Sequence, residues 1–140
     1  MEQIELNECI NYLLTKSQYK VFQRIHALLK PFNITPMQYD VLYCLWQTDH
    51  RSPKQIASEL KLDNSTISKL LDQMSKKELI TRYVYTEDRR YVIVKLTEKG
   101  KSLKNPLLQA MSQANHALLV NIPENQQQLL KQNLRLIAEL

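Results

Sequence analysis

The sequence predicts a mainly α-helical domain, spanning residues 1–140, with one small β-hairpin in its second half. The chain has one Gly and five Pro, too few for the many tight turns of an all-β fold. Apolar residues recur at three- and four-residue spacing over most of the length, which is the helical period. Only residues 80–96 depart from this, with two β-branched and aromatic runs around a polar loop.

The helices of the first half have recognisable ends. An amphipathic helix over residues 4–30 ends at Pro31. Thr35-Pro36-Met37-Gln38 is a capping box with Pro at the first helical position, and it opens a second helix with Met37, Val41, Cys44 and Leu45 on one stripe.

Two closely spaced helices follow. Ser52-Pro53-Lys54-Gln55 repeats the capping box and opens a short helix that ends at Leu60. Asp63 or Asn64 can cap the next helix, over residues 65–77, whose apolar stripe faces the core.

The second half begins with the hairpin, formed by strands Ile80–Tyr85 and Arg90–Leu96. Thr97 caps a helix that runs to about residue 120, and Pro106 predicts a kink or break near residues 102–105. The last helix covers residues 124–139. The expected order is therefore α-α-α-α-β-β-α-α.

Charge is concentrated in the middle of the chain. Residues 51–104 hold 13 Lys and Arg against 7 Asp and Glu, although the whole chain has a net charge of only +5. A basic central segment favours a polyanionic partner, with nucleic acid the first candidate; the alternative is an ordinary solvated charged face.

Several classes of protein are disfavoured. The N-terminus lacks a signal peptide, no apolar run is long enough to span a bilayer, and we expect a cytoplasmic protein. The two cysteines, Cys9 and Cys44, indicate neither a disulfide scaffold nor a metal site. No phosphate-binding loop, nucleophile elbow or carboxylate pair near a His indicates an enzyme, and we expect no cofactor and no metal.

Residues 53–79 match the spacing of a helix-turn-helix, whose second helix enters the DNA major groove. The small Ala57 lies where the two helices cross, and Lys61 occupies the turn position that is often Gly. The outer face of the second helix carries hydroxyls, an amide and a cation that suit phosphates and base edges: Ser65, Thr66, Ser68, Lys69 and Gln73.

A hairpin directly after a helix-turn-helix makes a wing. The loop at its tip contains Asp88, Arg89 and Arg90. Arginine can enter a narrow minor groove, and Asp88 can hold Arg90 in one orientation. The alternative for this loop is an exposed turn with a surface ion pair, and a winged helix used only for protein contacts is the alternative for the whole lobe.

In ordered combination, these motifs resemble the MarR family of bacterial transcriptional regulators. The resemblance rests on Asp88-Arg89-Arg90 with the following Val92, Val94, Leu96-Thr97 and Gly100, and on segments 34–39, 56–60 and 79–82. It implies a winged helix-turn-helix lobe over residues 35–100 and dimerisation helices over residues 1–30 and 101–140. It further implies a homodimeric repressor on a pseudo-palindromic operator in double-stranded DNA. Glu78 stands where family members commonly have Gly.

The resemblance also implies control by a small aromatic effector or an oxidant. The aromatic candidates for an effector pocket are Tyr12, His26, Tyr39 and Tyr43, for which core or dimer packing is the alternative. Cys9 is the candidate redox residue because a thiol-sensing branch of the family keeps a reactive Cys in a similar region. Its surrounding sequence matches that branch poorly, which leaves an incidental Cys as the alternative.

Overall fold

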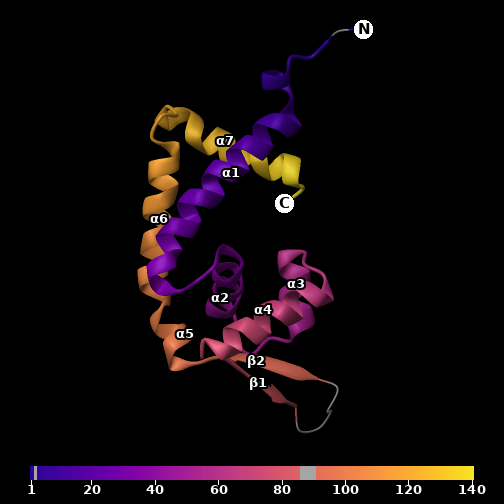
Figure 1. The fold of residues 1–140 in the computed structure, drawn as a ribbon, viewed down its shortest axis with the longest axis vertical. Helices are drawn as coiled ribbons and strands as arrows, with labels where there is room; N and C mark the ends of the chain where they lie inside the picture. The colour runs from indigo at the N-terminus through magenta and orange to yellow at the C-terminus, as the bar shows by residue number, and fades with distance from the viewer. Residues whose placement is uncertain (2, 86–90) are drawn as a thin grey trace.

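The computed structural model describes residues 1, 3–85 and 91–140 of the chain. The described residues form seven α-helices and one two-stranded antiparallel sheet, whose arrangement is drawn in Figure 1. Two short 3-10 helices, Leu6–Glu8 and Lys30–Phe32, flank the first α-helix. The elements are α1 (Ile10–Leu29), α2 (Pro36–Gln47), α3 (Pro53–Leu60), α4 (Asn64–Lys76), β1 (Ile80–Val84), β2 (Val92–Leu96), α5 (Glu98–Ser102), α6 (Lys104–Leu119) and α7 (Glu124–Ala138).

The chain divides by position into a terminal half and a central half. In Figure 1, α1 and α7 cross at the end near the N-terminus, whereas α3, α4 and the hairpin lie at the opposite end. Helix α6 runs alongside α1 and connects the two halves. The order of elements is the one expected from the sequence, except that the helix after the hairpin is divided in two.

Local sequence chemistry sets the helix ends. Thr35 and Ser52 each form a complete capping box, and Asp63 and Thr97 accept hydrogen bonds from backbone amides of the first turns of α4 and α5. The expected break near residues 102–105 falls at Leu103, between α5 and α6. Pro106 thus lies in the first turn of α6, where its missing N–H leaves no helical hydrogen bond unmade.

The turns that lack the usual glycine keep a left-handed backbone. Lys61, between α3 and α4, has φ 55°, and Glu78, after α4, has φ 59°. Both residues therefore adopt the conformation that Gly takes most easily, at a conformational cost to the chain. The departure at Glu78 leaves the helix end with a left-handed cap of the ordinary kind.

The hairpin is attached to the core by one face. Ile80 pairs with Leu96 and Arg82 with Val94 in the register. Ile80, Val94 and Leu96 are buried, whereas the rest of β1, from Thr81 to Val84, is exposed on both faces. A further backbone bridge between Arg51 and Val94 fixes β2 to the loop before α3.

The core joins the two halves through α2 and α6. Val41, Cys44 and Leu45 of the expected α2 stripe are buried, but Met37, in the first turn of the helix, is 38% exposed. Leu29 and Leu107 are fully buried where α1 and α6 approach α2.

The terminal helices leave much of their apolar surface uncovered. Helix α7 has no buried residue, and Leu134, Leu136 and Ile137 are each more than 40% exposed. Ile10 and Leu14 of α1 are also exposed. Exposed apolar surface of this extent is typical of interaction sites.

Candidate nucleic-acid interface

Helix α4 presents the polar face expected of a recognition helix. Ser65, Ser68, Lys69 and Gln73 are exposed, whereas Ile67, Leu70, Leu71 and Met74 are buried on the other side. Thr66 is half-buried at the edge of the polar face. The buried stripe fixes the rotation of the helix, so that its hydroxyls, amide and cation point away from the core.

The N-terminus of α4 is capped by a carboxylate. The Thr66 amide donates to Asp63 Oδ1 across 2.7 Å, and the Ser65 hydroxyl donates to the same oxygen across 3.0 Å. These hydrogen bonds, those from Thr66 first, hold the pKa of Asp63 below its ordinary value. The Thr66 amide is therefore already bound within the chain, and the Ser65 hydroxyl, which donates its proton to Asp63, keeps only its acceptor lone pairs for a further partner.

The hairpin is tied to α4 by an ion pair. Arg82 Nη1 of β1 lies 2.7 Å from Asp72 Oδ1 of α4. Asp72 carries the one negative charge on the outer face of α4, and the positive charge of Arg82 offsets it. The wing residues predicted to contact DNA, Asp88, Arg89 and Arg90, lie outside the described residues.

The base of the hairpin is fixed by the loop between α2 and α3. Asp49 Oδ1 accepts from the Leu96 amide at 3.0 Å and from the His50 amide at 2.8 Å. Arg51 exchanges backbone hydrogen bonds with Val94, and its guanidinium contacts Glu59 of α3. These contacts set the direction of the wing relative to the helix pair.

The C-terminal end of α4 is held by two lysines. Lys77 Nζ donates to the Asn33 carbonyl and to Oε1 of the buried Gln38, both at 2.8 Å, and Lys99 Nζ donates to the Lys77 carbonyl at 2.9 Å. Burial, and then the nearby charge of Lys99, lower the pKa of Lys77. The recognition helix is thereby connected directly to the junction of α1 and α2.

Sequence reasoning missed Asp49, Arg51, Arg82 and Lys77, because each acts on a partner from another element. The one local signal is that Asp49 precedes a left-handed His50, which is a turn feature.

The aromatic effector candidates separate into two groups. Tyr39 and Tyr43 of α2 line one cavity, and their ring centroids are 6.3 Å apart. Tyr12 and His26 of α1 are not among the residues that line it; Lys16 lies over the Tyr12 ring and Phe22 stacks on His26.

The two cysteines have different surroundings. Cys9 is half-buried at the residue before α1, whereas Cys44 is 2% exposed in α2. Burial, followed by the charge of Glu59, raises the pKa of the Cys44 thiol to about 11. Cys44 is therefore a protonated packing residue rather than a nucleophile.

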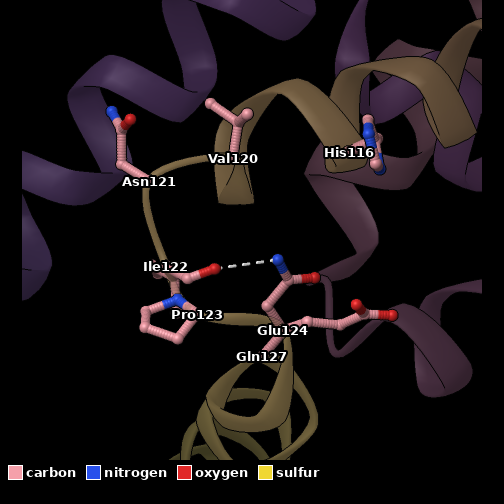
Figure 2. A pocket seen from close by; sticks show the side chains of 7 residues that line it. All are labelled: His116, Val120, Asn121, Ile122, Pro123, Glu124 and Gln127. Atoms are coloured by element: carbon pink, nitrogen blue, oxygen red, sulfur yellow. Dashed lines mark hydrogen bonds between the residues drawn. The ribbon is translucent and has the colours of Figure 1, made fainter.

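A large apolar groove separates the terminal helices. It has a volume of about 910 Å³ and lies between α1, α6 and α7, lined by leucines that include Leu13, Leu14, Leu118, Leu130 and Leu134. Figure 2 shows the corner between α6 and α7, where the Gln127 side chain points back to the turn. Gln127 Nε2 donates to the Ile122 and Leu119 carbonyls at 3.0 and 3.1 Å, which fixes the angle at which α7 leaves α6.

Within the described ranges, no helix is both long and apolar enough to cross a membrane. The same part of the chain holds no cluster of three or more His, Cys, Asp or Glu that could bind a metal ion.

Comparison with known proteins shows that the chain is similar to transcriptional regulators. Residues 34–92 match the model of the MarR family. The chain is 34% identical over 103 residues to the organic hydroperoxide resistance transcriptional regulator of Bacillus subtilis, covering 74% of this chain and 70% of that protein.

The fold matches solved structures over nearly the whole length of the chain. The transcriptional repressor CouR bound to a 23-mer DNA duplex superposes with a TM-score of 0.90 at 26% identity, covering 99% of this chain and 98% of CouR. CouR from Rhodococcus jostii RHA1 bound to p-coumaroyl-CoA gives a TM-score of 0.81 at 23% identity, covering 97% and 96% of the two chains. The predicted winged helix-turn-helix fold, with additional N- and C-terminal helices, is thereby confirmed.

Proposed function

This chain is a DNA-binding transcriptional regulator of the MarR family, not an enzyme, and we propose that it acts as a homodimeric repressor that a small effector releases from a pseudo-palindromic operator. The observation that carries the DNA-contact part of the proposal is the face of α4. It presents Ser65, Ser68, Lys69 and Gln73 to solvent beside a wing that an ion pair holds in place.

The DNA-contact residues that we propose are those of the outer face of α4 together with the wing tip. Serine and threonine hydroxyls bond phosphates and base edges, Gln73 can read adenine, and Lys69 can reach a phosphate or guanine. In the wing, Arg90 would enter the minor groove with Arg89 beside it, and Asp88 would orient Arg90. The full set is Ser65, Thr66, Ser68, Lys69, Gln73, Asp88, Arg89 and Arg90.

Dimerisation through residues 1–30 and 101–140 is supported by the uncovered apolar surface of α1 and α7. Helix α7 has no buried residue, so its apolar stripe lacks the packing that usually stabilises an amphipathic helix. A second copy placed against the groove between α1, α6 and α7 would bury Leu134 and Ile137. Two lobes, each covering residues 35–100, would then present two α4 helices about one DNA turn apart.

The test of DNA contact is fluorescence anisotropy with duplex DNA at several salt concentrations. We expect Lys69→Ala and Arg90→Ala each to weaken binding and to reduce the slope of log affinity against log salt by about one. The matched control is Arg24→Ala, which removes one positive charge from the exposed surface of α1. If Lys69→Ala and the unaltered protein have equal salt slopes, Lys69 of α4 does not contact DNA. If the chain binds no DNA at all, the alternative of a protein-interaction module is favoured.

The test of the dimer is sedimentation of the chain and of Leu134→Glu. The unaltered protein should sediment at twice the 16.5 kDa mass of one chain, and the variant should dissociate. A stable monomer of the unaltered protein at micromolar concentration would contradict the dimer.

A second candidate for control is oxidation of Cys9. Its support is the relative from Bacillus subtilis, which is named for organic hydroperoxide resistance. Cys9 is the more exposed of the two cysteines. A thiolate would attack the peroxide oxygen, form a sulfenic acid and release the alcohol. Peroxide treatment that changes neither the mass of the Cys9 peptide nor the DNA affinity would exclude this candidate.

A further inference from the structure

The side chain of Lys77 leaves the polar face of α4 and turns toward the junction of α1 and α2. Lys77 is the first residue after α4 and follows Lys69 and Gln73 at four-residue spacing, so a continued helix would place it beside them. In the structure its Nζ instead donates to the Asn33 carbonyl and to Oε1 of Gln38, both at 2.8 Å. The ammonium group is therefore engaged within the protein, unlike the exposed Lys69 and Gln73.

Both acceptors belong to the junction of α1 and α2. Asn33 ends the short helix that follows α1 and has a left-handed backbone with φ 57°. Gln38 is 1% exposed, and its Oε1 also accepts from the Thr35 amide at 3.2 Å, which closes the capping box of α2. Because the turn and the cap hold both acceptors in place, their hydrogen bonds fix the position of the Lys77 ammonium group.

A second set of contacts holds the same end of α4 to the beginning of α5. Lys99 Nζ donates to the Lys77 carbonyl at 2.9 Å, and Thr97 Oγ1 donates to the Glu78 carbonyl at 2.6 Å. The C-terminal end of α4 is thus tied to two separate parts of the chain, in each case by hydrogen bonds between different elements.

The anchored end controls the direction in which the other end of α4 points. About 12 residues separate Lys77 from Ser65, which at about 1.5 Å per residue is about 18 Å of helix. A tilt of about 10° at Lys77 would displace Ser65 by about 3 Å, which is the length of a whole hydrogen bond. The buried stripe of α4 sets the rotation of the helix about its axis, and the anchor at Lys77 limits its tilt.

We propose that Lys77 is a positioning residue for sequence recognition, which fixes the tilt of α4 from the protein side and does not itself contact DNA. The inference rests on the proposed DNA contacts of α4 and names the residue that orients them. Contacts to base edges depend on the direction of α4, whereas the phosphate contacts of non-specific binding tolerate a shift. Loss of the Lys77 hydrogen bonds therefore lowers the affinity for the operator more than the affinity for random duplex DNA.

The test measures the affinity of the full chain for two duplexes of equal length by fluorescence anisotropy, one selected from a random pool and one of scrambled sequence. Lys77→Met keeps the apolar stem of the side chain and removes its donors. We expect it to lower the ratio of the two affinities by about three- to tenfold, with the slope of log affinity against log salt unchanged. The matched control is Lys76→Met, which removes an equal charge from an exposed position in the last turn of α4 and should leave the ratio unchanged.

Two variants of Gln38 test the partner of Lys77. Gln38→Glu keeps an oxygen for both Lys77 and the Thr35 amide, and it should retain the ratio of the unaltered protein. Gln38→Met removes that oxygen and should lower the ratio, with a less than additive loss when it is combined with Lys77→Met. A thermal melt of each variant checks that the chain is folded at the temperature of the binding measurement, so that a lower ratio does not come from unfolded protein.

Three results would overturn the proposal. They are an unchanged ratio in Lys77→Met, an equal reduction of the ratio in Lys76→Met, and a salt slope of Lys77→Met reduced by about one, which indicates a lost phosphate contact. If Lys77→Met does not fold by circular dichroism, Lys77→Gln takes its place, because its shorter side chain does not reach both acceptors. An unaltered chain that binds the two duplexes equally would refute the proposed function as well, whereas a preference for the selected duplex that Lys77→Met retains in full refutes this inference alone.

Discussion

Arg82 in β1 and Asp72 in α4 form an ion pair with 2.7 Å between Nη1 and Oδ1, which joins the wing to the recognition helix. Both side chains are partly exposed, so the pair contributes little to the stability of the fold, about 0–1 kcal/mol. Its effect is on orientation, because it fixes the strand that leads to the wing tip relative to the outer face of α4.

The Arg82–Asp72 pair predicts an effect on DNA affinity opposite to the one expected from net charge alone. Asp72→Asn removes a negative charge from the proposed DNA-binding face, and Coulomb attraction alone would tighten binding. We expect weaker binding instead, by about three- to tenfold, because the wing loses its fixed direction before it docks. Anisotropy with operator DNA measures the affinity, and a thermal melt checks that the fold is unchanged. Affinity equal to or higher than that of the unaltered protein would exclude the orienting role.

The cap of the recognition helix makes stability depend on pH. Folding lowers the pKa of the Asp63 carboxyl below its ordinary value of 3.8. The ionised carboxylate therefore contributes to the stability of the fold at pH values above 3.8. The contribution is lost as the pH falls through the lower folded value. Asp63→Asn can still cap the helix but cannot titrate. We expect urea midpoints of the variant to fall less than those of the unaltered protein between about pH 6 and about pH 3. If the urea midpoints of the two proteins fall equally with pH, Asp63 is not the source of the pH dependence.

Gly100 is required by packing rather than by its backbone angle. A Cβ at this position would lie 2.3 Å from the Leu79 carbonyl oxygen and 3.1 Å from Leu96 Cδ2, where α5 passes the end of α4. The Gly100 carbonyl also accepts from Trp46 Nε1 at 2.9 Å. Gly100→Ala should destabilise the fold by about 1–3 kcal/mol in urea titrations, with altered Trp46 fluorescence. Lys101→Ala, at the exposed next position, is the control; equal midpoints for the two variants would show that the site relaxes freely.

The cysteines should differ in their rates of alkylation. Cys44 is buried, with its thiol pKa raised to about 11, whereas Cys9 is half-buried. Iodoacetamide at about pH 8 should therefore label Cys9 first, and Cys44 only after unfolding in urea, as followed by peptide mass spectrometry. Rapid labelling of Cys44 in the folded chain would show that α2 opens locally.

The parts of the fold that the sequence predicted are those set by local chemistry. Thr35, Ser52 and Thr97 satisfy amides within three residues, so their capping roles could be read from spacing alone, whereas spacing left Asp63 and Asn64 both open as the cap of α4, and the structure assigns Asp63. The break at Leu103 follows in the same way from Pro106.

The parts that could not be predicted depend on contacts across the chain. Asp49 accepts from Leu96, which is 47 residues away, and Lys77 reaches Gln38 over 39 residues. No local pattern marks such pairs, because an exposed Asp or Lys has the same sequence signature whether or not it meets a distant partner. The grouping of Tyr39 with Asp40 and Met111, apart from Tyr12 and His26, likewise depends on how α6 packs against α2.

The most direct test of the account is selection of binding sites from a random pool of duplex DNA, followed by sequencing. A homodimer that reads DNA through two α4 helices should enrich a pseudo-palindrome with half-site centres about 10–10.5 base pairs apart. Gln73→Ala should relax the preference at one symmetric pair of positions. Enrichment of a site without two-fold symmetry, or no enrichment above random sequence, would contradict recognition by paired helices.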